Sequence, residues 1–453
     1  MCVVKSDGNF GQQNQRTMKI AFLTLGCKLN YAETSTYERG FSANGLEIVP
    51  WEEKADVYLI NTCSVTERAE KKCRNVIRKM HRTAPEAKIV VTGCYAELRR
   101  EDLSRIEGVS LVFGAKDKSQ VVGRTMAMLR GEEMGSEDSF KQLSMAAEYK
   151  EISKETLSAF STEGRTRSFL KVQDGCNNFC AYCTVPYARG DSRNIPIAEV
   201  VSQAEQIAAG GVREIVLTGV NTGDFGRTTG EKFLDLLKRL NDVEGIERYR
   251  ISSIEPNLIT SEIIDWIASG TKFQPHFHIP LQTGSDTLLR RVGRKYSTDF
   301  FAERIEYIRS AMDPGRSGGC SAMDPFVFFG IDVIVGLPGE TQELFEETYS
   351  FLNDRIRPSY IHVFPYSKRP GTVAAQWKDQ VRDSVKTERV AILENLCSEL
   401  HSEFIAKNRG RRSTVLWESD EKNGMMGGYT GNYIRMEKPY DESSVNRIEE
   451  III

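Results

Sequence analysis

The chain has 453 residues, more than the roughly 250 to 300 residues at which one hydrophobic core stops growing, so we expect two or three domains. Its 60 Lys and Arg residues against 63 Asp and Glu residues give a formal charge of -3, which excludes a globally basic nucleic-acid binder. The N-terminus MCVVKSDGNFGQQNQRT has no apolar core, and the most apolar run, FVFFGIDVIVGLP, contains Asp332 and is too short to cross a bilayer. We therefore predict a cytoplasmic protein without a membrane partner.

The first predicted domain covers residues 18 to 130. Its β-rich runs MKIAFLT, ADVYLINT, AKIVVTG and SLVFG alternate with helical stretches, which is typical of a parallel sheet with helices on both faces. Cys27, Cys63 and Cys94 each lie at or just after the end of such a run, and these ends share one edge of a parallel sheet, so the three thiols can form one site. The alternative is unrelated buried thiols, which is how we interpret Cys2, Cys73, Cys320 and Cys397.

A polar linker is predicted at residues 131 to 167, and the alternation resumes at residues 168 to 377. The β-rich runs there are SFLKVQDG, VREIVLTG, RYRISSI, HFHIPL, FFGIDVIVG and SYIHVFPY. Helices are predicted at 197–209, 232–240, 261–269 and 342–352, and two helical stretches are predicted within 285–312. Six strand-helix units predict a partial, TIM-like barrel with its chemistry at the carboxyl ends of the strands. The motif SAMDP occurs at 310–314 and again at 321–325, with GRSGGC around Cys320 between the copies, which we interpret as a tolerated loop insertion.

The C-terminal part is predicted as a charged connecting helix at residues 378 to 410 and a small β module at residues 411 to 453. The module contains the runs STVLWE, GYTGNYIRM and EEIII and is close to the lower size limit for independent folding, so we expect it to pack on the barrel. Small barrels of this kind often carry nucleic-acid-binding loops. The predicted fold class is therefore α/β: a parallel-sheet N-terminal domain, a central partial TIM-like barrel and a small C-terminal β-barrel.

The stretch QDGCNNFCAYC places Cys176, Cys180 and Cys183 close together at the end of the first barrel run. A zinc site uses four protein ligands, or three and a water, and no nearby histidine completes the set here. A cubane [4Fe-4S] cluster needs one thiolate for each iron, so three cysteines leave one iron open to another ligand. A structural zinc site or inert thiols are the alternatives to such a cluster.

The spacing Cx3Cx2C, with the aromatic Tyr182 before the last cysteine, resembles the signature of the radical S-adenosylmethionine (SAM) superfamily. This resemblance implies that SAM binds the open iron through its amino and carboxylate groups. TLGCKLN, NTCSVTERAEKKCRN, VTGCYAE and KVQDGCNNFCAYCTVPYARGDSR are similar, over nearly the whole chain, to the methylthiotransferases. That family implies a radical SAM barrel, a C-terminal TRAM module that holds RNA, and a second [4Fe-4S] cluster on Cys27, Cys63 and Cys94.

Within the family, GCKLN, the Val-Thr after Cys63 and DGCNNFCAYC resemble the branch that converts threonylcarbamoyladenosine, beside the tRNA anticodon, to its 2-methylthio form. The isopentenyladenosine branch and the ribosomal-protein aspartate branch usually vary these motifs. The SAMDP duplication and the end of the chain after EEIII depart from the family pattern.

The resemblance also implies a mechanism that needs both clusters. The adenine C2–H is neither acidic nor a leaving group, so a radical derived from SAM must act there, and a second SAM methylates sulfur on the N-terminal cluster. All six cysteines are thus predicted to be catalytic, and the reaction requires tRNA, an electron donor such as a flavodoxin or ferredoxin, and a sulfur source.

Further SAM contacts are implied at the ends of the barrel strands. LTGVNTGDFG lies where members of the superfamily bind the SAM amino group, RISSIEPN and HIPLQTGSD offer polar side chains, and DVIVGLPGET places a glycine where backbone approaches adenine. The candidates are Thr218, Gly219, Asn221, Ser253, Glu255, Gln282 and Gly336. The alternative is structural, because Gly-Pro turns follow strands in any barrel and Ser or Gln there also caps helices.

Two basic segments are candidate contacts for tRNA phosphates. ERAEKKCRNVIRKMHR holds Arg68, Lys71, Lys72, Arg74, Arg78, Lys79 and Arg82, and KNRGRR holds Lys407, Arg409, Arg411 and Arg412. A charge run is usually a solvated helix face, so the segment beside the β module is the better candidate. Two other hypotheses remain open: a radical SAM enzyme that modifies a protein side chain, and a non-catalytic iron-sulfur regulator that binds RNA.

Overall fold

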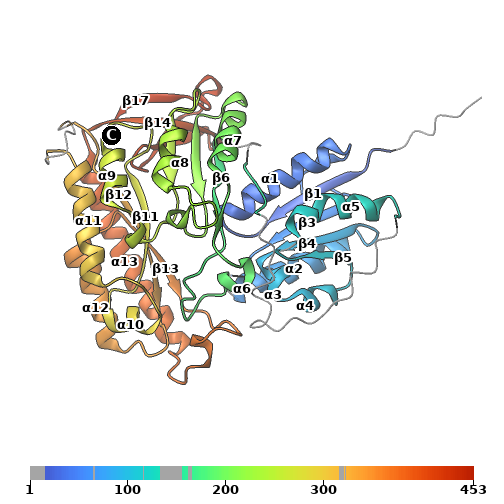
Figure 1. The fold of residues 1–453 in the computed structure, drawn as a ribbon, viewed down its shortest axis with the longest axis horizontal. Helices are drawn as coiled ribbons and strands as arrows, with labels where there is room; N and C mark the ends of the chain where they lie inside the picture. The colour runs from blue at the N-terminus through green and yellow to red at the C-terminus, as the bar shows by residue number, and fades with distance from the viewer. Residues whose placement is uncertain are drawn as a thin grey trace, which may run out of the picture.

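The computed structural model describes residues 16–64, 67–115, 117–132, 156–161, 166–315, 321 and 323–453. Cys2 and Cys320, the Val-Thr pair after Cys63 and most of the predicted linker lie outside the described residues. The described chain forms an N-terminal domain, a barrel and a C-terminal β module, and Figure 1 shows the N-terminal domain projecting from one side of the barrel. None of the described helices is long and apolar enough to cross a membrane.

The N-terminal domain is built on a parallel sheet with the strand order β2-β1-β3-β4-β5. Its strands are β1 (Lys19–Thr24), β2 (Glu47–Val49), β3 (Val57–Thr62), β4 (Lys88–Gly93) and β5 (Val109–Phe113). Its helices are α1 (Lys28–Ala43), α2 (Glu67–Thr83), α3 (Cys94–Leu98), α4 (Arg100–Ser104), the short η1 (Lys118–Gln120) and α5 (Val121–Leu129).

Alternation along the strands gives this sheet two covered faces. Val57 and Leu59 of β3 pack with residues of α1 and α5, whereas Tyr58 and Ile60 pack with residues of α2. Successive side chains of a strand point to opposite faces, so a continuous apolar run such as VYLI is expected only where helices cover both sides. The predicted parallel sheet between two helical layers is therefore what the structure shows.

The barrel contains six parallel strands in chain order, arranged as β6-β9-β10 and β11-β12-β13. They are β6 (Arg167–Lys171), β9 (Glu214–Thr218), β10 (Arg248–Ile251), β11 (His276–Gln282), β12 (Phe328–Val335) and β13 (Tyr360–Pro365). A bridge between Tyr249 and Phe273 and the hydrogen bond from Ile254 N to the His278 carbonyl (3.1 Å) join the two halves. All six predicted strand runs are present, so the sequence located this sheet correctly.

The helices of the barrel region lie on its outer side or in the loops that follow its strands. They are α6 (Val185–Arg189), α7 (Ile197–Ala209), η4 (Thr222–Asp224), α8 (Phe233–Asn241), η5 (Pro256–Leu258), α9 (Ser261–Ala268), α10 (Asp286–Arg291), α11 (Thr298–Met312), α12 (Gln342–Ser350) with the π turn η6 (Phe351–Ile356), and η7 (Ala374–Gln376). The hydroxyls of Thr260, Ser297 and Thr341 accept hydrogen bonds from the first turns of α9, α11 and α12. These N-caps explain why the three helices begin where they do.

The predicted connecting helix is α13 (Asp383–Asn408), and it is part of the barrel wall. Leu393, Leu396 and Leu400 belong to the same core as the barrel strands. Arg389 of α13 donates to Glu340 Oε1 at 2.6 Å, and the same oxygen accepts the backbone N–H of Gly336 at 2.7 Å. This buried contact ties α13 to the loop after β12.

The C-terminal module is a four-stranded antiparallel sheet in the order β16-β15-β14-β17. Its strands are β14 (Arg412–Lys422), β15 (Met425–Thr430), β16 (Arg435–Pro439) and β17 (Ile448–Ile452), with the short η8 (Glu442–Ser444) before the last. The sequence run GYTGNYIRM is split by a turn, in which Tyr433 adopts a φ of 65°. The α/β fold class predicted from the sequence is confirmed, and the exact domain boundaries stay predictions.

The module covers the amino ends of the barrel strands (Figure 1). Arg250 of β10 donates to the carbonyl oxygens of Gly431 and Thr430, both at 2.8 Å, and is almost fully buried. Tyr433 packs against His276 and Phe328, with ring centroids 4.7 and 5.7 Å away. The module thus closes the end of the barrel opposite to the carboxyl ends of the strands.

The second SAMDP copy contacts this module. The backbone N–H of Arg412 donates to the Met323 carbonyl at 2.9 Å, and Arg411 Nη1 donates to the Asp324 carbonyl at 3.0 Å. The first copy ends α11, where Asp313 accepts the N–H of Val327 at 3.0 Å. The insertion is therefore tolerated because its second copy forms a turn that β14 can rest on.

Candidate functional site

Cys176, Cys180 and Cys183 lie in the loop after β6 and the short β7 (Gln173–Asp174), which pairs with β8 (Arg193–Asn194). Gly175 begins this loop with a φ of 73°, and a Cβ there would lie 1.9 Å from the Asp191 carbonyl oxygen. Only glycine fits such a position. The loop is thereby folded tightly at the carboxyl end of the barrel, where the chemistry of this fold is expected.

Each of these three sulfur atoms accepts an N–H hydrogen bond. The donors are the backbone of Asn178 to Cys176 (3.5 Å), the backbone of Val185 to Cys183 (3.4 Å) and Arg294 Nη1 to Cys180 (3.4 Å). Burial raises the pKa of Cys176 to about 11 and that of Cys183 to about 12. Thiolates form in such a place only when a cation replaces the proton, so the loop fits an iron-sulfur cluster whose sulfurs accept hydrogen bonds.

The three N-terminal cysteines share one edge of their sheet. Cys27 follows β1 as the N-cap residue of α1, Cys63 follows β3, and Cys94 follows β4. The strand order 2-1-3-4-5 reverses between β1 and β3, which is where flavodoxin-like sheets bind their ligands. The structure therefore places these cysteines together at the expected ligand-binding edge.

Local contacts fix this arrangement. Thr62 and Gly93 are direct partners in the β3–β4 ladder, so the cysteines that follow them are neighbours. Gly93 has a φ of 104°, and a Cβ there would lie 2.3 Å from the Thr62 carbonyl oxygen. Asn30 of α1 donates to that same carbonyl at 3.2 Å and accepts the thiol of Cys27 at 3.1 Å.

Cys73 and Cys397 behave as core thiols, as expected. Cys73 is fully buried among residues of α2 and the sheet, and burial raises its pKa to about 12. Cys397 lies in the barrel core. Cys27, in contrast, is exposed, and Cys63 and Cys94 are half-buried.

The two cysteine loops meet where the domains join. Helix α3 begins at Cys94, helix α6 begins two residues after Cys183, and the two helices contact each other, as Figure 1 shows. Helix α1, which follows Cys27, packs on the first barrel strand β6. The loop that carries Cys183 and the start of α3 at Cys94 therefore both lie beside the junction of the two domains.

A buried group of charges holds this junction together. Glu33 of α1 accepts hydrogen bonds at one oxygen from Lys118 (2.9 Å), Lys171 of β6 (3.1 Å) and Arg189 of α6 (3.2 Å). Asp174 of β7 is 2.7 Å from Lys171 and 2.9 Å from Arg189. We call Glu33, Lys118, Lys171, Asp174, Arg189 and Arg193 the junction network; all six are buried.

The junction network contains more cationic side chains than carboxylates. This surplus of positive charge favours anionic groups beside the network. Burial lowers the pKa of Arg189, but the anionic groups beside it hold that pKa well above its usual range. Cys94 is the first of these groups, and Cys27 is among the others. Arg189 Nη2 is buried and has no hydrogen-bond partner among the described residues. A cluster held by three thiolates would supply the negative charge and the acceptors that this guanidinium lacks.

A second buried contact joins the domains beside Cys63. Arg369, in the loop after β13, donates to Ser64 Oγ at 2.7 Å and also bonds Glu70 of α2. Ser64 directly follows Cys63, and its hydroxyl donates to Glu70 at 2.5 Å. The loop that carries Cys63 is therefore held by the barrel as well as by its own domain.

Comparison with known proteins agrees with these sites. Residues 19–114 match the family described as uncharacterized protein family UPF0004, and residues 170–352 match the radical SAM superfamily. The threonylcarbamoyladenosine tRNA methylthiotransferase MtaB of Bacillus subtilis (strain 168) is 40% identical over 440 residues, which cover 96% of this chain and 93% of the relative. The chain belongs to the methylthiotransferase family of radical SAM enzymes.

Other relatives agree with this assignment. The MtaB protein of Aquifex aeolicus is 36% identical over 93% of this chain and 97% of its own length. A tRNA-2-methylthio-N(6)-dimethylallyladenosine synthase of Wolinella succinogenes is 33% identical over 92% of this chain and 93% of its own. The radical SAM methyltransferase TsrM from Kitasatospora setae, with a bound SAM analogue, has a TM-score of 0.57 at 14% identity over 79% of this chain and 75% of its own, which shows a common fold.

The predicted family, its threonylcarbamoyladenosine branch and the enzyme class are thereby confirmed. As a radical SAM enzyme, this methylthiotransferase uses SAM and a [4Fe-4S] cluster. The residues that bind them stay predictions.

Some of the predicted SAM contacts are connected to the barrel cysteine loop. Asn221 donates its N–H to Gln173 at 3.0 Å and accepts the N–H of Glu255 at 3.3 Å. Gly219 packs on Gln173, where a Cβ would lie 2.9 Å from its side-chain oxygen. Thr218 Oγ1 is buried without a hydrogen-bond partner among the described residues, which fits a group that binds a ligand.

Arg294 is a site residue that the sequence did not reveal. Besides its bond to Cys180, it donates to Glu255 at 2.5 Å and to Tyr296 at 2.9 Å. Burial raises the pKa of Glu255, although Arg294 acts against that rise. The only available signal was a basic residue within the predicted helical range 285–312, which is too common to single it out.

The other predicted SAM contacts have structural roles that the contacts within the protein make visible. Tyr182 packs with Val292 and Leu337 under the cysteine loop. Ser253 accepts hydrogen bonds from Thr222 at its carbonyl oxygen. Gln282 ends β11 with a φ of 74°. A Cβ at Gly336 would lie 2.3 Å from Lys386 of α13, so this glycine is required by the protein's own packing, whatever it does for SAM.

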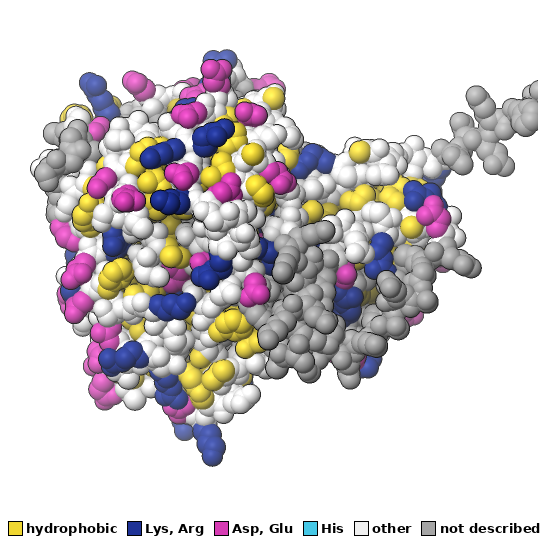
Figure 2. Space-filling model, viewed as in Figure 1, with side chains coloured by type: hydrophobic (Ala, Val, Ile, Leu, Met, Phe, Trp, Pro, Cys, Tyr) yellow, Lys and Arg dark blue, Asp and Glu magenta, His cyan; other side chains and the backbone are white. Residues whose placement is uncertain are grey.

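Both basic segments are partly committed to the fold. In α2, Arg74 donates to Tyr95 at 2.7 Å, whereas Lys71, Lys72, Arg78, Lys79 and Arg82 are exposed. Beside the C-terminal module, Arg411 packs over Phe326 at 4.2 Å, whereas Arg409 and Arg412 are exposed. On the face in Figure 2, basic and acidic side chains are interspersed over the barrel, as the overall charge of -3 predicts.

Replacing Glu33 by Gln should lower the free energy of unfolding by about 3 to 5 kcal/mol, because three buried cations would lose their shared carboxylate. Burial raises the pKa of Glu33, but the three cations outweigh it and hold the pKa far below its usual range. The lost stability is therefore fully present at neutral pH and disappears only in strong acid. Denaturant unfolding of the wild type and the variant measures it.

Glu47→Gln is the matched control, because Glu47 pairs with Lys19 at 3.6 Å while half exposed, and its loss should cost at most about 1 kcal/mol. Equal unfolding midpoints for the two variants would contradict the role of the junction network.

Proposed function

We propose that this methylthiotransferase inserts sulfur and a methyl group at C2 of threonylcarbamoyladenosine beside the tRNA anticodon, using two SAM molecules and two [4Fe-4S] clusters. The observation that carries the proposal is the contact between α3 and α6, because α3 begins at Cys94 and α6 begins two residues after Cys183. The substrate follows from the relatives, since the two named for threonylcarbamoyladenosine are 40% and 36% identical and the one named for dimethylallyladenosine is 33% identical.

Cys176, Cys180 and Cys183 would hold the cluster that binds SAM, and Cys27, Cys63 and Cys94 would hold the second. When bound, the first group supplies the electron that cleaves SAM and the second carries the sulfur that is methylated and transferred. The chain itself orients these groups: three N–H donors bind the barrel sulfurs, and Arg189 offers a free donor at the junction. Such preorganisation keeps the reacting groups at fixed positions without solvent.

The proposal also requires partners. An electron donor such as a flavodoxin or ferredoxin must reduce the barrel cluster, and a sulfur source must renew what each turnover consumes. A tRNA substrate places the reaction in the cytoplasm. Arg409 and Arg412, exposed at the start of the C-terminal module, are the residues that we propose for the grip on tRNA phosphates.

Mass spectrometry of tRNA nucleosides from a strain that lacks this gene tests the substrate. We expect 2-methylthio-threonylcarbamoyladenosine to disappear and threonylcarbamoyladenosine to accumulate, with recovery from a plasmid that carries the wild type but not Cys94→Ala. Loss of the methylthio form of isopentenyladenosine instead would favour the related branch. Unchanged nucleosides would favour a protein substrate or a non-catalytic regulator.

The iron content tests the two cysteine sets. Anaerobically reconstituted enzyme should bind about eight irons, four for each cubane. Replacing Cys27, Cys63 and Cys94 together by Ala should remove half, and replacing the three barrel cysteines should remove the other half together with the production of 5′-deoxyadenosine. Cys73→Ala is the control, because Cys73 is a buried core thiol, and it should keep full iron content. Eight irons in either triple variant would refute that ligand set.

The tRNA grip is tested by salt dependence. Arg409→Ala with Arg412→Ala should weaken tRNA binding and flatten the slope of log K against log salt by up to about 0.7 to 0.9 for each lost phosphate contact. Arg213→Ala is the matched control, because Arg213 is an exposed arginine paired with Glu247 on the barrel surface. An unaltered affinity and slope in the double variant would make the exposed face of α2 the leading candidate.

A further inference from the structure

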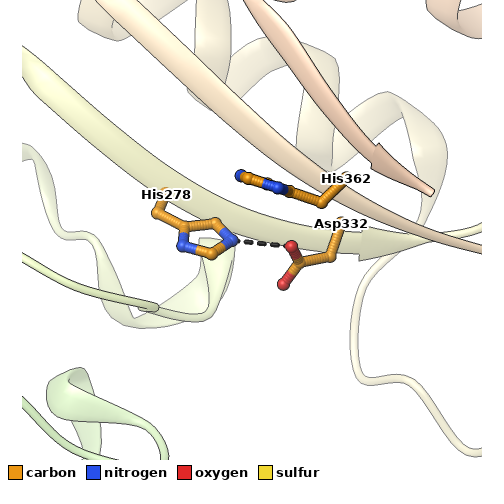
Figure 3. Close-up of side chains that lie close together, drawn as sticks. All are labelled: His278, Asp332 and His362. Atoms are coloured by element: carbon orange, nitrogen blue, oxygen red, sulfur yellow. Dashed lines mark hydrogen bonds and ion pairs between the residues drawn. The ribbon is translucent and has the colours of Figure 1, made fainter. Parts of the chain in front are cut away.

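Three polar side chains lie together inside the barrel, away from both cysteine loops. His278 of β11, Asp332 of β12 and His362 of β13 come from adjacent strands and point toward one another, as Figure 3 shows. His278 Nε2 is 2.7 Å from Asp332 Oδ1, and one ligand atom of each residue lies within 4.8 Å of the others. We call His278, Asp332 and His362 the interior triad.

Strand alternation places the interior triad on the inner face of the barrel. Phe277 and Ile279, which flank His278, belong to the core between the strands and the outer helices, as do Ile331 and Val333 around Asp332. Neighbouring residues on a strand point to opposite faces, so the triad faces inward. The side chains of His278 and Asp332 are 22% and 18% exposed, which leaves them accessible to a ligand.

The position of the interior triad along the length of the barrel is also defined. Two residues before His278, His276 is buried under Tyr433, where the C-terminal module closes the barrel. Four residues after His278, Gln282 ends the strand at the end where the cysteine loop lies. The triad therefore lies between the closed end of the barrel and the two sets of cysteines. A base that reaches the cysteines would place a substituent at this level.

The polar character of the interior triad selects among possible ligands. Two histidines and a carboxylate also suit a divalent metal, so the test below includes the metal content of the chain. An apolar isopentenyl group would leave these polar side chains without hydrogen-bond partners, which costs free energy in a buried site. A substituent with its own carboxylate, hydroxyl and N–H groups exchanges hydrogen bonds with the histidines and the aspartate together.

We propose that His278, Asp332 and His362 bind the threonylcarbamoyl group of the substrate and so select it against isopentenyladenosine. The interior triad exchanges hydrogen bonds with the carboxylate, hydroxyl and urea groups of that substituent. The proposal rests on the proposed function for the identity of the substrate, and it adds the residues that recognise the substituent.

The test compares anticodon stem-loop RNAs that differ only in the target base: threonylcarbamoyladenosine, its threonine methyl ester, isopentenyladenosine and unmodified adenosine. Binding to the reconstituted holoenzyme is measured without turnover, and kcat/KM separately. The wild type should prefer the threonylcarbamoyl RNA to the other three. His362→Gln and Asp332→Asn, which nearly keep the size of the side chains, should lose this preference by about ten- to a hundredfold while binding unmodified RNA as the wild type does.

Recognition of the carboxylate is tested by pairing a protein change with a substrate change. If His362 binds the carboxylate, His362→Gln should weaken binding of the acid form more than binding of the methyl ester, so the two changes should not add. His401→Ala is the matched control, since His401 of α13 is half-buried like His362 and bonds only the Ser359 carbonyl (3.0 Å) within the described structure.

Three outcomes would overturn the proposal. The first is an equal loss on all four RNAs, which would mean a structural role. The second is an unaltered preference in the triad variants. The third is one zinc, manganese or cobalt ion per chain that disappears in Asp332→Asn, which would make the triad a metal site. Failure of the proposed function is separate: the wild type would then bind the RNAs but methylthiolate none of them.

Discussion

The carboxylate of Glu33 is the interaction on which the arrangement of this enzyme depends. One oxygen accepts hydrogen bonds from Lys118 of its own domain and from Lys171 and Arg189 of the barrel. Because Lys171 ends β6 and Arg189 ends α6, the carboxylate fixes the barrel strand and the helix on either side of the SAM-type cysteine loop. Removing charges from water costs several kcal/mol for each ion, so a junction of this kind holds only if every member is in place.

The same network also bears on the proposed pairing of the two cysteine sets. The surplus of positive charge at the junction is unfavourable by itself, because like charges in a low-dielectric setting repel. Thiolates on both sides would reduce that cost, and Arg189 still has a donor to offer them. Assembly of the clusters and docking of the domains are thus expected to stabilise each other, which also accounts for the second contact of Arg369 with Ser64 beside Cys63.

Much of this architecture could be predicted from the sequence, because it follows local rules. The barrel strands appear as β-rich runs at regular spacing, and Cys27, Cys63 and Cys94 follow strands whose ends share one edge. The junction network could not be predicted, because the partners that join the two domains are more than a hundred residues apart, as for Glu33 and Lys171. One signal was present: Glu33 falls between Leu29 and Tyr37 on the buried stripe of α1, where a lone acid indicates a buried cation.

The polar side chains inside the barrel could not be predicted from the sequence for a related reason. His278 and Asp332 interrupt apolar strand runs, and in a two-sided sheet such interruptions mark the inner face, but sequence alone does not say whether that face is filled or open. The C-terminal module decides this, since Arg250 and Tyr433 close only one end of the barrel. The interior triad, which lies above that closed end, stays accessible. Polar groups with unused hydrogen-bonding capacity are tolerated in such an interior only if a ligand completes their hydrogen bonds. If the interior triad binds the substituent as proposed, recognition depends on how deeply the base can enter, and the C-terminal module sets that depth.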